Sequence, residues 1–272
     1  MTKRLGISDL KLITQTLKNL YGYDYNDYSF TFYKRVLENL FQLYNIYRSE
    51  DFVYQIEKDS NFQEVLHEQL VVEETEMFRD PTMWRYLKTS IFPRLQKTGQ
   101  FSIWLPEVST GEELFTLAIT LKEAGLLEQV NIFATSISKR RIEYVKRGSY
   151  ELKKIQNNDA NYKRYRSDAD LGIFYNEIEN KGCMDTSLLR NVELKHISIG
   201  QYPSFPHVKL ILYRNKFIYM SQTLQAKTML KLNESLMPAG IFAVGIKESI
   251  DSNLADNKLS VFFKEEHIYK KS

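Results

Sequence analysis

Apolar residues in the first part of the chain recur at the three- and four-residue spacing of an α-helix. Leu10, Ile13 and Leu17 form one stripe, and a second runs from Tyr33 to Tyr44. That spacing places the apolar side chains on one face of each helix. The pattern predicts an all-α N-terminal domain over residues 1–80.

Polar residues predict where several of these helices begin. Ser8 and Asp9 stand ahead of the first stripe as candidate caps. Ser60 with Gln63 has the spacing of a capping box. The pair Asp80-Pro81 is typical of a helix start, with a capping side chain followed by proline in the first turn.

Beyond residue 100 the pattern changes to short apolar runs that alternate with helical stripes. The predicted strands cover residues 101–105, 130–134, 192–197, 208–212, 240–246 and 260–263. Helices are expected after the first two strands, the second of them from Ser138 to Gly148, and over residues 221–237. Such alternation is typical of a parallel or mixed sheet with helices on both faces. We therefore predict an α/β domain over residues 81–272.

Residues 149–190 interrupt the alternation. They are rich in Asn, Asp and Tyr and contain no long apolar run. The segment from Leu171 to Tyr175 is the best candidate for a strand. We interpret this region as an insertion that forms a small antiparallel β-subdomain.

Charge and composition exclude several classes of protein. The net charge of +3, from 37 basic and 34 acidic residues, is too small to indicate a nucleic-acid partner. A single cysteine, Cys183, and four scattered histidines give no metal-binding pattern. Residues 1–12 lack an apolar signal core, and no apolar run reaches about 18 residues. We expect a cytoplasmic protein without a membrane span or a metal site.

The most informative stretch runs from Ile103 to Leu114. It predicts a strand, a turn that contains Gly111, and a helix that begins with Glu112 and Glu113. The end of the first strand of a doubly wound sheet is where nucleotide-like ligands bind. The alternative is an ordinary strand–helix turn, in which the two carboxylates only interact with the helix dipole.

Five short motifs in this order resemble the CheR-type protein-glutamate O-methyltransferases, which methylate bacterial chemotaxis receptors. They are TEMFR at 75–79, VSTGEE at 108–113, ATSIS at 134–138, YRNKFIY at 213–219 and LMPAG at 236–240. The similarity extends over nearly the whole chain, including the helical region and the insertion.

The resemblance implies a fold, a reaction and a partner. The fold is a Rossmann-like methyltransferase domain with a small β insertion, preceded by an all-α domain. The cofactor is S-adenosyl-L-methionine, which leaves as S-adenosyl-L-homocysteine. The acceptor is a glutamate in the cytoplasmic signalling region of a chemoreceptor or a similar protein, and we expect the enzyme to be a monomer.

The resemblance also assigns roles to residues. Arg79 and Tyr219 match residues at the reacting groups: Arg79 would hold a carboxylate, and the hydroxyl of Tyr219 would orient the acceptor. The implied cofactor-binding residues are Thr75, Arg79, Glu113, Ser136, Ser198, Ile199, Arg214 and Asn215.

Several positions depart from the family pattern. Ser136 stands where an acid normally grips the ribose hydroxyls, and Ser198 stands where asparagine is usual. Pro106-Glu107-Val108 replaces small residues and places a carboxylate close to the site. One interpretation is a divergent methyltransferase with weakened cofactor binding. The others are a catalytically silent CheR-like module that binds a receptor or signalling partner, and a methyltransferase for another substrate.

Overall fold

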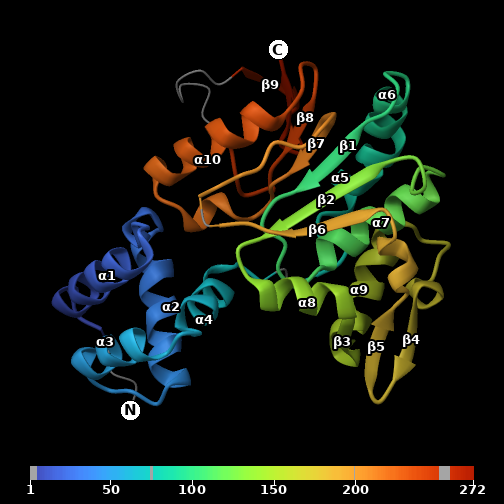
Figure 1. Cartoon of the computed structure of the whole chain (residues 1–272). Coiled ribbons are helices and arrows are strands. Elements are labelled where there is room, and N and C mark those ends of the chain that lie inside the picture. Colours follow the sequence, from blue (N-terminus) through green and yellow to red (C-terminus); the bar gives the residue numbers. More distant parts are fainter. Residues whose placement is uncertain (1–4, 74–75, 199, 251–257) are drawn as a thin grey trace.

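The computed structural model describes residues 5–73, 76–198, 200–250 and 258–272. Figure 1 shows a group of helices at the N-terminal end of the chain and a larger part in which helices flank a twisted sheet. The predicted fold class, an all-α region followed by an α/β domain, is confirmed. The division at residue 80 stays a prediction.

The N-terminal region is a helical bundle with a common core. Its helices are α1 (Ile7–Tyr21), α2 (Phe30–Leu43), α3 (Ser49–Lys58) and α4 (Phe62–Leu70). Ile13, Leu37, Phe52 and Leu66, one from each helix, are fully buried in that core. The prediction missed α3, which is short and buries few apolar residues. Among the described residues, no helix has the length and apolar character needed to cross a membrane.

The predicted helix starts are only partly right. α1 begins after Gly6, and the Asp9 carboxylate accepts the Gly6 N–H at 2.9 Å from inside the first turn, so Ser8 and Asp9 are not the cap. The capping box at residues 60–63 is wrong, because α4 follows Asn61 without a side-chain cap. Asp80 does precede a helix with proline in its first turn, but its carboxylate binds Arg214 instead of capping.

The main sheet of the α/β domain has the strand order β6-β2-β1-β7-β8-β10-β9. The strands are β1 (Ser102–Leu105), β2 (Asn131–Ser136), β6 (Val192–His196), β7 (Val208–Leu212), β8 (Ile241–Ala243), β9 (Leu259–Phe263) and β10 (Ile268–Lys271). The pairs from β6 to β8 are parallel, and β10 runs antiparallel to both of its neighbours. The prediction missed β10.

Two layers of helices cover the sheet, as the alternation predicted (Figure 1). One layer contains α5 (Pro81–Tyr86), η2 (Leu87–Ile91), α6 (Phe92–Gln96), α7 (Glu112–Glu123) and α8 (Lys139–Arg147), and the other contains α10 (Gln222–Ser235). Ile103 belongs to the buried cluster that contains Leu117 of α7, whereas its neighbour Trp104 belongs to the cluster that contains Leu232 of α10. Adjacent residues of a strand point to opposite faces, so β1 supplies both cores.

The insertion is a small antiparallel sheet with a helix. Its strands, in the order β3-β5-β4, are β3 (Ser149–Glu151), β5 (Lys181–Met184) and β4 (Tyr175–Ile178). The strand predicted at residues 171–175 is wrong: Leu171–Phe174 is a 3-10 turn (η3), because Asp170 accepts the Gly172 N–H at 2.8 Å. Helix α9 (Leu152–Tyr165) was not predicted, since most of its surface is polar.

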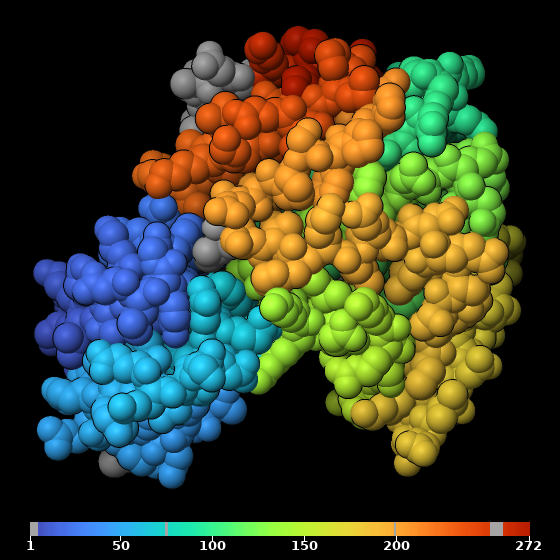
Figure 2. All heavy atoms as spheres, viewed as in Figure 1, coloured from blue at the N-terminus to red at the C-terminus, as the bar shows by residue number. Residues whose placement is uncertain are grey.

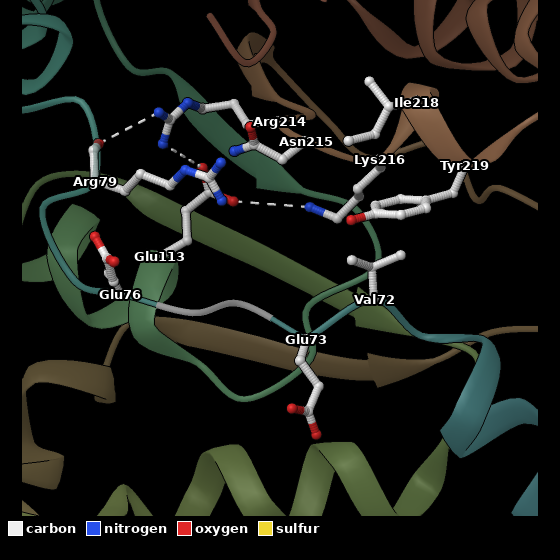
Figure 3. A pocket seen from close by; sticks show the side chains of 10 residues that line it. All are labelled: Val72, Glu73, Glu76, Arg79, Glu113, Arg214, Asn215, Lys216, Ile218 and Tyr219. Atoms are coloured by element: carbon white, nitrogen blue, oxygen red, sulfur yellow. Dashed lines mark hydrogen bonds and ion pairs between the residues drawn. The ribbon is translucent and has the colours of Figure 1, made fainter. Parts of the chain in front are cut away.

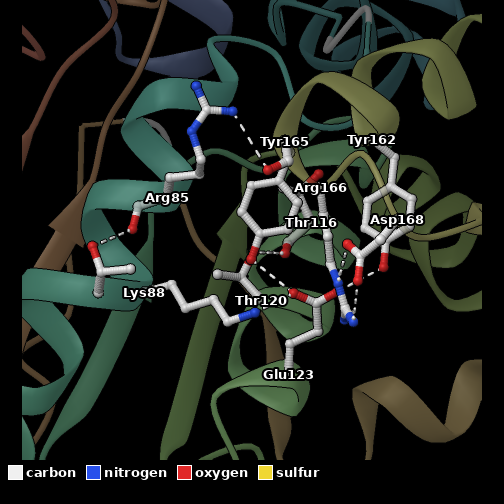
Figure 4. Close-up of polar contacts among 10 residues, drawn as sticks. Arg85, Lys88, Thr116, Thr120, Glu123, Tyr162, Tyr165, Arg166 and Asp168 are labelled. Carbon is white, nitrogen blue, oxygen red and sulfur yellow. Dashed lines mark hydrogen bonds and ion pairs between the residues drawn. The ribbon is translucent and has the colours of Figure 1, made fainter.

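A buried carboxylate attaches α9 to the rest of the domain (Figure 4). Glu123, at the end of α7, accepts hydrogen bonds from Lys88 at 2.6 Å, Tyr162 at 2.6 Å, Tyr165 at 2.8 Å and Arg166 at 3.3 Å. Burial pushes the pKa of Glu123 upward, but the hydrogen bonds from Lys88 and the two tyrosines outweigh it and leave the pKa below its ordinary value. Glu123 therefore stays ionised at neutral pH, and its contacts join α7, η2 and α9.

The helical bundle and the α/β part of the chain share a packed junction (Figure 2). Ile137 and Ile197, which follow β2 and β6, belong to the core of the helical bundle. The Ser138 hydroxyl donates to the Glu64 carboxylate at 2.7 Å, and the Ser29 N–H donates to the Tyr219 carbonyl at 2.9 Å. The carboxyl ends of the strands therefore face the helical bundle.

Candidate functional site

The turn from β1 into α7 depends on a glycine. Gly111 has φ +94°, a left-handed conformation that side chains disfavour. A Cβ on Gly111 would lie 3.0 Å from the Tyr150 hydroxyl and 3.3 Å from Val145. Tyr150 also donates to the Thr110 carbonyl at 2.7 Å. Packing against α8 and β3 thus explains this glycine.

The two carboxylates that begin α7 point in different directions. Glu112 is fully buried and pairs with Lys154 of α9. Glu113 pairs with Arg214 at 3.0 Å and with Lys216 at 3.7 Å. Glu112 therefore holds the insertion, and Glu113 faces the loop that follows β7.

Arg214 is the centre of a buried charge cluster. Its side chain is 3% exposed and forms ion pairs with Glu113 and, at 2.6 Å, with Asp80. It also donates to the Arg79 carbonyl at 3.3 Å, and its guanidinium lies 5.5 Å from the ring centroid of Trp84. The planar fork of an arginine suits such simultaneous contacts. Arg214 thereby fixes the start of α5 relative to α7.

A cavity of about 90 Å³ lies beside this cluster, next to the junction with the helical bundle (Figure 3). Its walls come from three separate segments of the chain: Val72, Glu73, Glu76 and Arg79; Glu113; and Arg214, Asn215, Lys216, Ile218 and Tyr219. Five of the predicted site residues are thus brought together, namely Arg79, Glu113, Arg214, Asn215 and Tyr219. Figure 3 shows the Tyr219 ring beside Lys216 and the Glu73 side chain extending away from the charged cluster.

Glu248 supports this loop and was not predicted. Its carboxylate accepts the backbone N–H groups of Asn215 at 2.6 Å, Gly245 at 2.8 Å and Ile218 at 3.4 Å. A Cβ on Gly245 would lie 2.5 Å from the Asn215 side-chain oxygen, so glycine is needed there. A single acidic residue just after the predicted strand at 240–246 gave no sequence signal of this role.

Two of the remaining predicted cofactor residues, Ser136 and Ser198, are not among the described residues that line the cavity. Ser136 is fully buried, and its hydroxyl accepts the Ser138 N–H at 3.4 Å. Ser198 is exposed. Thr75 and Ile199 lie outside the described residues. The roles assigned to these four residues stay predictions.

A second cavity, of about 350 Å³, adjoins the first between α2 and α8. It is lined by Phe32, Arg35, Val36, Asn39, Gln69, Val71, Val72, Glu73, Arg141 and Tyr219. The two cavities share Val72, Glu73 and Tyr219. Tyr219, whose ring centroid lies 4.8 Å from that of Phe32, therefore lines both cavities.

Another carboxylate lies at the end of β1, as the departure from the family pattern indicated. Glu107 accepts hydrogen bonds from the hydroxyls of Tyr202 and, at 2.9 Å, of Tyr213. Burial, followed by the charge of Glu107, raises the pKa of both tyrosines well above the usual value. Both hydroxyls therefore keep their protons at neutral pH. Tyr202 was not predicted, because the segment around it carries no recognisable motif.

The charged cavity suits one end of S-adenosylmethionine better than the whole molecule. Arg79 offers a guanidinium for a carboxylate, and Glu113, which also pairs with Arg214 and Lys216, lines the same cavity as an acceptor for an ammonium group. The amino-acid end of the cofactor carries both groups. Pockets that enclose a ligand of its full size measure about 300–1,000 Å³, and this cavity is far smaller, at about 90 Å³.

Comparison with known proteins gives concordant matches. The family model described as CheR methyltransferase, SAM binding domain, matches residues 73–265. Cher3, a provisionally assigned methyltransferase of Pseudomonas putida, is 27% identical over 264 residues, which are 97% of each chain. A chemotaxis protein methyltransferase of Borreliella burgdorferi is 23% identical over 261 residues, covering 90% of this chain and 89% of its own. Chemotaxis protein methyltransferase 1 of Pseudomonas aeruginosa is 23% identical over 204 residues, covering 71% and 72%.

Proposed function

Because the chain belongs to the CheR methyltransferase family, we propose that it transfers a methyl group from S-adenosylmethionine to glutamate side chains of a chemoreceptor. The products are S-adenosylhomocysteine and a glutamate methyl ester. The observation that carries the proposal is the cavity where Arg79, Glu113 and Tyr219 meet, although they lie far apart in the sequence. We further propose that the protein acts in the cytoplasm as a monomer.

The chemistry requires few protein groups. When bound, S-adenosylmethionine supplies a methyl group that its sulfonium centre already activates. A glutamate carboxylate is ionised at neutral pH, since its ordinary pKa is about 4.3, so the site needs no general base. The protein contributes by positioning, which supplies on the order of 7–11 kcal/mol in favourable cases.

Tyr219 is the residue we assign to positioning the acceptor. It lines both cavities, so its hydroxyl can reach a carboxylate that enters from one and reacts at the other. Its backbone is fixed by the hydrogen bond from Ser29, and its ring packs against Phe32. The helical bundle therefore sets the position of this side chain.

We propose that the receptor glutamate enters through the second cavity. Arg35 of α2 and Arg141 of α8 both line it, which favours a negatively charged side chain. Glu73 offsets part of this charge through its ion pair with Arg141 at 3.2 Å, but the Glu73 side chain is 65% exposed. An approaching carboxylate can displace such an exposed partner at small cost.

The test is transfer of radiolabelled methyl groups to a receptor signalling fragment, compared with the same fragment carrying glutamine at the acceptor positions. We expect base-labile label on the first fragment alone. Tyr219→Phe should slow transfer at least about tenfold, a loss of about 1.4 kcal/mol. The matched control is Tyr54→Phe, since Tyr54 is 61% exposed on α3. Equal label on both fragments would contradict the proposed acceptor.

A catalytically silent module is the alternative, and Ser136 and the Glu107 cluster favour it. Under this alternative the protein would bind the receptor fragment but neither bind S-adenosylhomocysteine at millimolar concentration nor transfer methyl groups. Calorimetry with the nucleoside and with the fragment, in separate titrations, distinguishes the two functions.

A further inference from the structure

The carboxyl ends of β1 and β7 form the position where this sheet would accept a ligand. From β1 the chain proceeds outward to β2 and β6, and it then returns to the other side of β1 as β7. In open α/β sheets, ligands bind outside the carboxyl ends of the strands at such a reversal of strand order. Glu107 follows β1 and Tyr213 follows β7, so both residues lie at this position.

That position is filled by the protein's own side chains. The Glu107 carboxylate accepts hydrogen bonds from Tyr202 and Tyr213, each through a different oxygen. The Tyr202 ring contacts Trp104 of β1 edge-on, with centroids 5.8 Å apart. Phe205 of the same segment stacks on Phe133 of β2, with centroids 4.1 Å apart. The segment from residue 200 to 206 therefore lies against β1 and β2.

The backbone of Glu107 has a conformation that suits glycine. Its φ is +57°, in the left-handed region that few residues with side chains adopt. A glycine at such a turn lets a ligand approach the backbone closely. Here a carboxylate extends into that space. Because Val108 donates its N–H to the Thr135 carbonyl at 2.8 Å, the side chain is held close to the end of β2.

We propose that Glu107 and Tyr202 occupy the nucleoside half of the cofactor site, so that adenosine binds only after the Tyr202 segment moves away. This inference rests on the proposed function. It accounts for the small volume of the charged cavity, which is then the amino-acid half that stays open. It also explains why serine is tolerated at position 136. An acid that binds the ribose hydroxyls would have no ligand to bind while the nucleoside space is closed.

The test compares the affinity of the full chain for adenosine and for S-adenosylhomocysteine by calorimetry. Glu107→Gly removes the carboxylate and relieves the backbone, and we expect both ligands to bind at least about tenfold more tightly. Tyr202→Ala opens the same space and should act in the same direction. The matched controls are Glu179→Gly, at an exposed turn with φ +48°, and Tyr54→Ala on the surface of α3. Both controls should bind like the wild type.

Affinity that is unchanged or weaker in both Glu107→Gly and Tyr202→Ala would overturn the inference, since neither side chain would then exclude the nucleoside. Tyr202→Ala keeps the test valid if Glu107→Gly does not fold. Methyl transfer, measured separately, reports on the proposed function. Tighter binding without transfer by any variant would refute the reaction and leave the inference standing. If the wild type transfers methyl groups and neither variant binds the ligands more tightly, the reaction stands and the inference is refuted.

Discussion

Replacing Glu123 with glutamine should destabilise the α/β domain through one buried cluster. The carboxylate is 5% exposed and accepts hydrogen bonds from Lys88, Tyr162, Tyr165 and Arg166. Glutamine keeps the shape but removes the charge and one acceptor oxygen. Its amide group would then face donors that are already in place.

The size of the effect follows from the partners. Hydrogen bonds to a charged acceptor contribute about 1.5–3 kcal/mol each, and breaking a buried ion pair costs about 3–5 kcal/mol. The Lys88 side chain is 27% exposed, so water partly compensates for the loss of its partner. We therefore expect Glu123→Gln to lower the free energy of unfolding by about 3 kcal/mol at pH 7, at the lower end of that range.

The pH dependence provides a second check. The folded-state pKa of Glu123 lies below its ordinary value: burial raises it, but the hydrogen bonds from Lys88, Tyr162 and Tyr165 outweigh burial. Its stabilisation is therefore complete above the unfolded pKa of about 4.3 and is lost as the pH falls through the folded pKa. Glutamine does not titrate at this position. The difference between wild type and variant should thus shrink below about pH 4.

Urea unfolding at pH 7, 4 and 3, followed by tryptophan fluorescence, measures this difference. Glu177→Gln on the exposed side of β4 serves as the control and should leave the midpoint unchanged. A difference below about 1 kcal/mol at pH 7, within the range of a single neutral hydrogen bond, would refute the reasoning. So would a difference that is the same at pH 3 as at pH 7.

Three further substitutions have defined expectations. Gly111→Ala should lower the free energy of unfolding by about 2–3 kcal/mol, because its φ is +94° and the new Cβ would lie 3.0 Å from the Tyr150 hydroxyl; urea unfolding measures the loss. Arg214→Met should cost about 3 kcal/mol, since it leaves two carboxylates without their shared cation, and calorimetry should show weaker binding of S-adenosylhomocysteine. Glu248→Gln should cost about 1.5–3 kcal/mol, because the carboxylate accepts three backbone N–H groups, and amide exchange of Asn215 should accelerate.

Long periodic segments could be predicted from the sequence, and short polar ones could not. The stripe at Leu10, Ile13 and Leu17 has the period of a helix, and the short apolar run that forms β7 has the length of a buried strand. α9 buries Tyr162 and Tyr165 among many polar residues, so its apolar face is masked in a one-dimensional pattern. β10 is short and lies among charged residues, and its place is set by pairing with β8 and β9.

The sequence predicted those site residues that belong to recognisable motifs. Arg79, Glu113 and Tyr219 belong to recognisable motifs, and they meet at one cavity. Glu248 and Tyr202 act through contacts 33 and 95 residues away in the chain, with Asn215 and Glu107. A local pattern contains no information on such distant partners, so only the folded arrangement identifies them.

Ile137 and Ile197 of the α/β part pack in the core of the helical bundle. This packing limits how the protein can be cut into separate fragments. A fragment that ends before α5 would lack two side chains of its hydrophobic core. The remaining fragment would expose both isoleucines to water. We therefore expect either fragment to aggregate when it is produced alone. Co-expression of both, or proteolytic nicking that leaves them associated, is the workable route for dissecting the molecule.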